Sequence, residues 1–168
     1  MIGSDRLVSF FHLLLLWLHL IAAITWIGGM VFLSAVLAPL VRQRKAAPEF
    51  MALFRTAALR FRLVVYGAIA LLLGTGPLLL HERGLSLFDP HRWPTVLRVK
   101  LGLVVVLLIL TVVHDLILGP RMRTISAISD AARSPWERTL MRTSAWLPRL
   151  SLLVALAVLW AAAALARS

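Results

Sequence analysis

Cysteine is absent from this 168-residue chain, and acidic residues are scarce. Without cysteine there is no disulfide framework, no thiolate metal site and no cysteine nucleophile. Only 7 Asp and Glu stand against 18 Lys and Arg, which gives a formal net charge of +11. The chain also lacks a P-loop, a dinucleotide-binding glycine loop and the H-E-x-x-H and G-x-S-x-G motifs. Nothing therefore indicates a nucleotide-dependent enzyme or a hydrolase, and no catalytic residue is assigned.

Apolar residues, in contrast, make up 61% of the chain, and its mean hydropathy is +0.91. An ordinary soluble domain has an apolar share of about 45–50%. Four runs match the length of about 20 residues that a helix needs to cross a hydrocarbon core. They are residues 7–40, 63–80, 96–118 and 147–165. We predict an all-α, polytopic membrane protein, a four-transmembrane-helix bundle in which residues 1–168 form a single membrane domain.

Positive charge is concentrated in two of the connections between these runs. Residues 42–62 contain six Lys and Arg against Glu49, and residues 121–149 contain six Arg against Asp130 and Glu137. The N-terminal stub and the connection 81–94 are balanced in charge. Because cytoplasmic loops carry the excess of Lys and Arg, both termini are predicted to lie outside an inner (plasma) membrane. The basic loops are expected to meet anionic lipid head groups, and no motif indicates a nucleic-acid partner.

Parts of both basic connections mix Arg with large apolar side chains at helical spacing. These parts are residues 49–62 and 135–146. Such a pattern is typical of a helix that lies in the plane of the membrane interface. We therefore expect short interfacial amphipathic helices in the cytoplasmic loops.

Ionisable residues inside apolar spans are the best functional pointers, because burying them costs at least about 2.5 kcal/mol at the helix centre on insertion scales. In the first span His12, His19 and Trp26 recur at seven-residue steps. They form one stripe, which drifts only about 20° per heptad and so faces a common neighbour. Thr75, flanked by glycines on the second span, is expected at the depth of His19.

Further candidates lie near both ends of the spans. Lys100 enters from the third span close to the level of His19, and His81 and His91 lie in or beside the outer connection. We expect three imidazoles, including His12, to converge at that end. Structural alternatives stay open: His12 and Lys100 can snorkel to the interface, and His81 and His91 can be ordinary loop residues.

His114 lies apart from these residues, towards the cytoplasmic end of the third span, and Asp115 follows it. Asp115 is placed to orient the His114 imidazole, although a salt bridge to Arg60 or Arg62 is an equal alternative. Imidazole is an axial ligand of haem iron and also binds copper. The candidate metal ligands are His12, His19, His81, His91 and His114.

Several short segments together resemble one family. They are His19, Ala22-Ala23, Trp26-Ile27-Gly28-Gly29 and Pro39, then Arg60-Phe61-Arg62, Thr75-Gly76, Lys100-Leu101, His114-Asp115 and Gly119-Pro120-Arg121. This pattern is similar to that of CopD-like (copper-resistance protein D domain) membrane proteins. The HemJ-type membrane proteins, which are linked to haem b, share an early His and Trp and a later Lys. Here these would be His19, Trp26 and Lys100. The resemblance implies a metal or haem connection.

The leading hypothesis is a CopD-like protein that holds a redox cofactor, haem b, by His19 with help from His12 or Lys100. It would transfer electrons to or from a redox partner protein, and His114 is the candidate ligand of a second centre. Copper movement or copper tolerance through the same histidine stripe is the alternative. A third hypothesis is a cofactor-free membrane subunit that scaffolds a partner, and self-association is compatible with all three.

Overall fold

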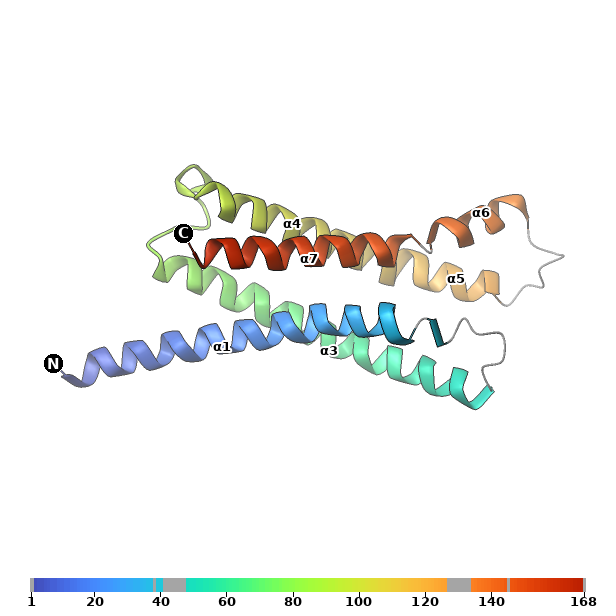
Figure 1. Ribbon diagram of the computed structural model, residues 1–168, viewed down its shortest axis with the longest axis horizontal. Helices are drawn as coiled ribbons and strands as arrows, with labels where there is room; N and C mark the ends of the chain where they lie inside the picture. Colours follow the sequence, from blue (N-terminus) through green and yellow to red (C-terminus); the bar gives the residue numbers. More distant parts are fainter. Residues whose placement is uncertain (1, 38, 41–47, 127–133, 145, 168) are drawn as a thin grey trace. The chain divides into compact units, whose positions relative to one another are not determined.

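The computed structural model describes residues 2–37, 39–40, 48–126, 134–144 and 146–167. These residues are largely helical and contain no β-strand. Four helices are long and apolar enough to cross a membrane: Ser9–Leu37, Ala52–Glu82, Thr95–Met122 and Leu147–Leu165 (Figure 1). The predicted all-α, polytopic membrane fold is therefore confirmed. The chain divides into two units, Met1–Trp93 and Pro94–Ser168, each built on a pair of helices.

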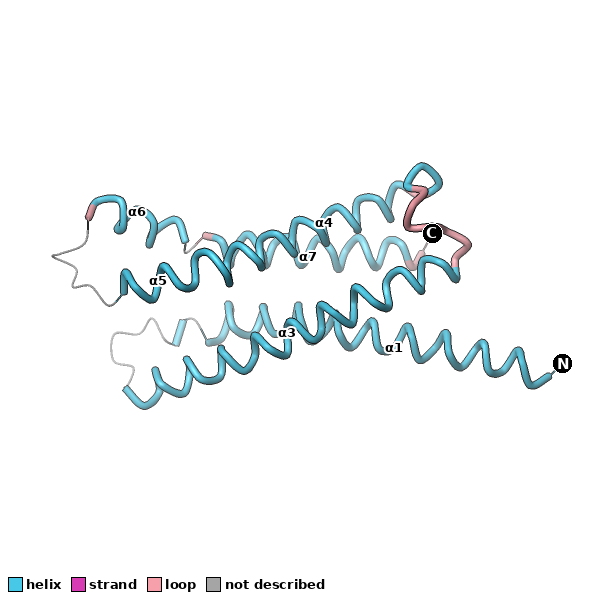
Figure 2. Tube along the Cα trace, turned by 180° about the vertical axis from the view of Figure 1, so that it is seen from behind, coloured by secondary structure: helices cyan, strands magenta, loops and turns pink. Residues whose placement is uncertain are grey.

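Unit 1 is an antiparallel pair of long helices. Helix α1 (Ile2–Phe32) continues as the short π-helix η1 (Leu33–Leu37), and α3 (Pro48–Glu82) runs back beside α1 (Figures 1 and 2). Buried positions recur at steps of three, four or seven residues: Ala22 and Trp26 on α1, and Val65, Ala68 and Thr75 on α3. This spacing is that of two helices packed along one seam.

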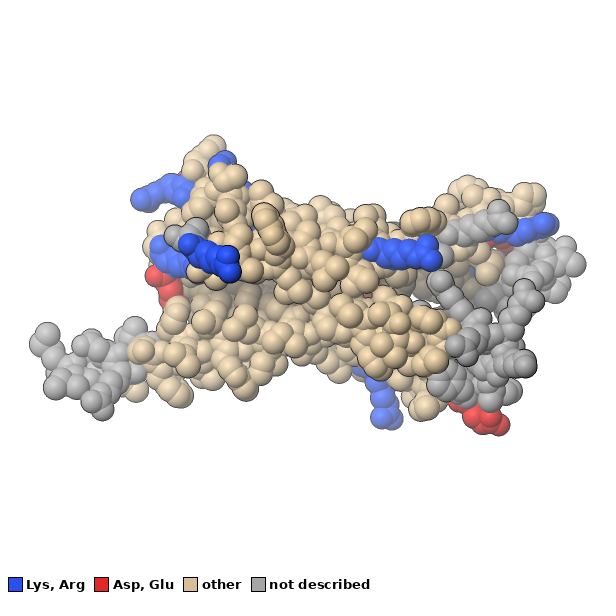
Figure 3. All heavy atoms as spheres, in the orientation of Figure 1, with Lys and Arg blue, Asp and Glu red and all other residues tan. Residues whose placement is uncertain are grey.

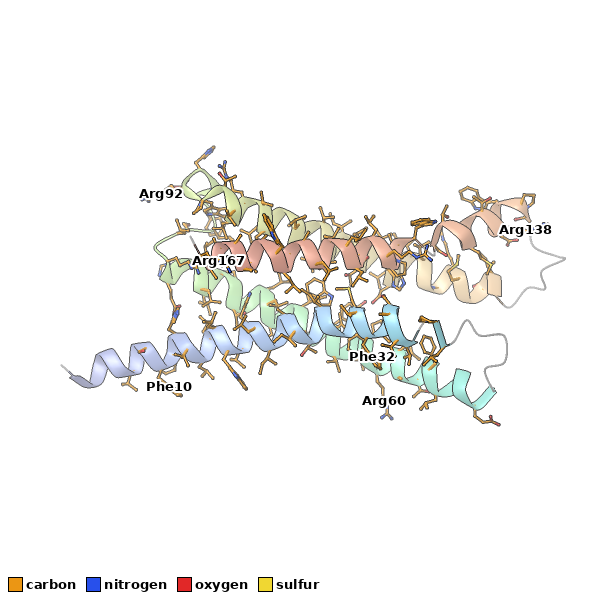
Figure 4. All side chains as sticks on the ribbon, in the orientation of Figure 1. Phe10, Phe32, Arg60, Arg92, Arg138 and Arg167 are labelled. Carbon is orange, nitrogen blue, oxygen red and sulfur yellow. The ribbon has the colours of Figure 1, made fainter. Side chains whose placement is uncertain are left out.

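The first turns of α3 differ from the prediction. Residues 49–62 were expected to form a separate interfacial helix, but they are continuous with the membrane span in one 35-residue helix. No Pro or Gly interrupts these residues, and extending a helix is far less costly than nucleating a new one. Arg60 projects away from α1 (Figure 4). The charged segment therefore lengthens the second span instead of lying apart from it.

A glycine cap closes α3. Gly84 has φ of +69°, in the left-handed region. The amide of Gly84 donates to the carbonyl of His81 at 2.9 Å, and the amide of Leu85 donates to the carbonyl of Leu80 at 3.2 Å. These two bonds are those of a Schellman motif, which satisfies carbonyls that the helix end leaves without donors.

We expect Gly84→Ala to lower the free energy of unfolding by about 1 kcal/mol, because a Cβ atom is disfavoured in the left-handed region. Denaturant unfolding of the detergent-solubilised protein, followed by circular dichroism, measures the change. Gly67→Ala on α3 is the matched control, since an added Cβ there meets no atom within 4 Å. Equal stability of the two variants would contradict the assignment of the cap.

Unit 2 contains α4 (Thr95–Val112), the π-helix η3 (Val113–Leu118), α5 (Gly119–Ser126), α6 (Pro135–Ser144) and α7 (Leu147–Leu165). Helices α4 and α7 run antiparallel in contact with each other (Figure 1). The buried side of α7 consists of Ser151, Ala155, Val158, Ala161 and Leu165, and α4 contributes Leu97 and Leu107. Small residues on α7 allow this close approach.

Helix α6 is the short separate helix expected in the second basic connection. A reciprocal capping box begins it: the amide of Ser134 donates to Glu137 Oε2 at 2.7 Å, and the amide of Glu137 donates to Ser134 Oγ at 3.3 Å. At its other end the Ser144 hydroxyl contacts Met122 Sδ of α5 at 3.3 Å. Helices α5 and α6 are thereby linked.

The outward faces of the long helices are apolar. Leu63 is 70% exposed and Leu13 is 66% exposed. Large apolar surfaces are unfavourable in water but match a lipid environment. On the face seen in Figure 3, Lys and Arg show towards the helix ends of each unit, with uncharged surface between. In unit 2, Arg138 and Arg167 mark opposite ends (Figure 4). The molecule is a multi-pass membrane protein.

Candidate functional site

The centre of unit 1 holds a hydrogen-bond chain that fixes His19. His19 Nδ1 lies 2.7 Å from Thr75 Oγ1, and the Thr75 hydroxyl donates to the carbonyl of Leu71, also at 2.7 Å. A hydroxyl has only one proton to donate. Thr75 must therefore accept from His19, so a neutral imidazole carries its proton on Nδ1 and its lone pair on Nε2. The predicted common depth of His19 and Thr75 is confirmed.

The segment of α3 that faces His19 is unusual for a helix. Thr75 is buried, and a Cβ atom placed on Gly76 would lie 3.8 Å from His19 Cε1. Pro77 follows within the helix and has no N–H to donate to the carbonyl one turn earlier. Next to the imidazole, Gly76 thus contributes low bulk and Pro77 interrupts the hydrogen bonding of the helix. Membrane helices tolerate such an interruption where neighbouring groups satisfy the polar atoms.

Two buried side-chain hydrogen-bond donors of unit 1 have no acceptor among the described residues. The Trp26 side chain is 3% exposed, and within the described residues neither Trp26 Nε1 nor Arg62 Nε has a hydrogen-bond partner. Trp26 is seven residues from His19, a rise of roughly 10 Å. A Cβ on Gly29 would overlap the ring of Phe61, the residue that precedes Arg62 on α3. Buried donors are nearly always paired, and an unpaired one costs about 1–3 kcal/mol.

His12 is paired with a carboxylate at the end of unit 1 where α3 terminates. His12 Nδ1 lies 2.5 Å from Glu82 Oε2, and the two side chains are 51% and 37% exposed. The expected convergence of His12, His81 and His91 is wrong: in the part of the chain that the structure describes, no group of three or more potential ligands could hold a metal ion. Consecutive helical residues point about 100° apart, so His81 is directed away when its neighbour Glu82 contacts His12.

The candidates of unit 2 are described separately from His19. His114 Nδ1 lies 2.9 Å from Asp115 Oδ1 within η3, and these side chains are 49% and 17% exposed. Asp115 therefore contacts the His114 imidazole, and its orienting role stays a prediction. Lys100 is half-buried on α4. Its expected proximity to His19 stays a prediction.

Residues 21–131, about two thirds of the chain, match the model of a domain of unknown function, DUF4149. The chain belongs to the DUF4149 family. No curated protein and no solved structure matches it. The matched DUF4149 segment includes Trp26, Thr75, Lys100 and His114, whereas His12 and His19 precede it. The resemblance to CopD-like and HemJ-type proteins stays a prediction for this DUF4149 protein.

Sequence reasoning missed Glu82 as the partner of His12, and it did not identify Arg62 as a buried donor. The signal for Glu82 was present, since seven residues back from His19 on α1 correspond to seven residues forward from Thr75 on the antiparallel α3. No such signal identifies Arg62 as a buried donor in this DUF4149 chain, because its burial depends on the length and packing of α3.

Proposed function

We propose that this protein binds a b-type haem within unit 1, with His19 as axial ligand, and serves electron transfer in the membrane. The observation that supports this most strongly is the hydrogen bond from His19 Nδ1 to Thr75, which fixes the orientation and the tautomer of the imidazole. Histidine ligands almost always donate their other ring N–H to a fixed acceptor, because this sets the tautomer and the ring orientation. Haem iron accepts such a nitrogen.

The two buried donors are candidate partners for the carboxylates of a haem. Its propionate carboxylates are hydrogen-bond acceptors, and Trp26 Nε1 and Arg62 Nε supply an indole N–H and a charged guanidinium N–H. Trp26 lies seven residues from His19 on α1, a rise of roughly 10 Å, and Arg62 lies 13 residues from Thr75 on α3, a rise of roughly 20 Å. The arrangement therefore combines an iron ligand with donors for an anionic group.

Haem suits these residues better than copper does. Copper sites in proteins are built from several imidazole or sulfur ligands. This chain has no cysteine, and its described residues contain no group of three His, Cys, Asp or Glu that could hold a metal ion. A haem supplies four nitrogen ligands of its own, so one well-oriented histidine suffices on one side of the iron. Copper movement along the stripe of His12 and His19 is the alternative.

The protein's own residues would hold and insulate the group. His19 Nε2 would bind the iron, Thr75 would keep the imidazole in place, and the apolar helices would exclude water. A bound haem would supply a one-electron couple for exchange with a redox partner protein. His114, held by Asp115, is the corresponding candidate in unit 2. A CopD-like role in the plasma membrane is part of this proposal.

The visible spectrum of the wild-type protein tests the proposal. After expression in haem-replete cells and purification from membranes, we expect a Soret band that shifts on reduction with dithionite. A spectrum without a Soret band contradicts the haem proposal. Metal analysis after copper loading then separates the alternatives: bound copper favours the copper hypothesis, and a protein without either group favours the scaffold hypothesis.

A further inference from the structure

A groove in unit 2 is formed where α6 ends and α7 begins. Its volume is about 520 Å³, within the range of about 300–1,000 Å³ that is typical of small-molecule sites. The lining residues are Leu118, Thr143, Ser144, Trp146, Leu147, Arg149, Leu150 and Leu153. One cation and no carboxylate belong to this lining, and leucine dominates the rest.

The lining residues of α7 form one stripe that is directed away from α4. Trp146, Leu150 and Leu153 follow one another at steps of four and three residues and are 66%, 49% and 65% exposed. The residues that α7 buries, such as Ser151 and Ala155, lie on another face. The groove is therefore open to the surroundings of the helix pair, which in this protein are lipid.

Arg149 is held at the polar end of the groove. Its guanidinium carbon lies 4.9 Å from the centre of the Trp146 ring, in a cation–π arrangement. No carboxylate pairs with Arg149 among the residues that the structure describes. A stacked guanidinium keeps its planar set of donors, which matches the geometry of a phosphate. Trp146 itself is typical of the level of lipid head groups.

We infer that this groove binds an anionic phospholipid. The phosphate of the lipid lies at Arg149, and one acyl chain follows Leu118, Leu150 and Leu153. The second basic connection, with six Arg against two acidic residues, adds a positive field around the same end of the unit. A zwitterionic lipid finds no carboxylate in the lining for its ammonium group, so the groove prefers a head group with net negative charge. This inference is independent of the proposed haem.

Quenching of Trp146 fluorescence by brominated lipids tests the inference. The full-length protein in detergent micelles is titrated with phosphatidylglycerol or phosphatidylcholine that carries bromine on the acyl chains. Subtracting the signal of Trp146→Phe isolates the groove. We expect saturable quenching with an affinity for phosphatidylglycerol about tenfold above that for phosphatidylcholine. Arg149→Gln should remove this preference, since a charged hydrogen bond contributes about one order of magnitude in affinity.

Arg167→Gln is the matched control, because it removes the same charge at the opposite end of unit 2 (Figure 4). It should leave the midpoint of the phosphatidylglycerol titration unchanged. Equal midpoints for the two lipids, quenching that does not saturate, or equal midpoints for Arg149→Gln and Arg167→Gln would overturn the inference. Displacement of the lipid by inorganic phosphate at millimolar concentration would show a simple anion site and overturn it too. If Arg149→Gln does not fold, Arg149→Lys should give an intermediate preference.

Discussion

A His19→Ala variant is expected to lose its haem, with the ratio of Soret to protein absorbance falling at least about tenfold. The alanine removes Nε2, the nitrogen that the proposal assigns to the iron. Loss of a mere orienting partner of a metal ligand typically costs 10–100-fold in affinity, so loss of the ligand itself should cost no less. The Thr75 hydroxyl keeps its bond to the carbonyl of Leu71 in this variant. The helix pair should therefore persist, which circular dichroism checks.

His12→Ala is the matched control for this experiment. It makes the same substitution one heptad away on the same helix, and it breaks only the contact with Glu82 at the end of α3. We expect it to keep the Soret band. Thr75→Val should keep the haem more weakly and shift its midpoint potential, because the imidazole loses its acceptor. Equal haem loss in His12→Ala and His19→Ala, or retention in both, would remove His19 from the role of ligand.

A Gly29→Ala variant is expected to destabilise unit 1 by about 1–3 kcal/mol, the usual cost of overpacking a well-filled interface. The added methyl group would overlap the ring of Phe61, which lies across the backbone of α1 at this position. The ring must shift to make room for this methyl group, which weakens its packing against α1. Denaturant titration of the micelle-bound protein, followed by far-ultraviolet circular dichroism, measures the loss.

Gly28→Ala provides the contrast, since an added Cβ there meets no atom within 4 Å. Alanine is the better helix former by about 1 kcal/mol, so this variant should be neutral or slightly stabilised. Adding Phe61→Ala to Gly29→Ala should recover part of the loss, because the two sites are in contact and their effects are not additive. Indistinguishable unfolding of the two glycine variants would rule out close packing at Gly29.

The spans could be predicted because a membrane restricts the chain so strongly. Backbone groups in lipid must be satisfied within a helix, so length and apolarity suffice to identify one. The last predicted span, 147–165, coincides with α7. The seven-residue step from His12 to His19 also predicted correctly that both face one neighbour, since helical periodicity fixes direction along a single helix.

The remaining features depend on contacts between helices. The second span was predicted to begin at residue 63, because the arginines before it lower the apolar content. Helical hydrogen bonding does not depend on apolarity, and α3 begins at Pro48. The direction of His81 depends on whether His81 or its neighbour Glu82 contacts α1. Glu82 makes this contact, with His12. The unsatisfied donor of Arg62 follows from packing. Of these, only the pairing of Glu82 with His12 is indicated by residue spacing; the start of α3 and the burial of Arg62 could not be read from composition or spacing.

The π-helix η3 sets the rotational phase of everything that follows it. A π-turn holds more residues than an α-turn, so one residue of surplus turns the subsequent helix by about 100° relative to a regular continuation. Helix α5 presents Met122 to Ser144 from that altered phase. Shortening residues 113–118 by one would restore α-helical phase and turn Met122 away, while α4 before the break kept its seam with α7. The segment that holds His114 thus also sets the rotation of α5 relative to α4 within the third span.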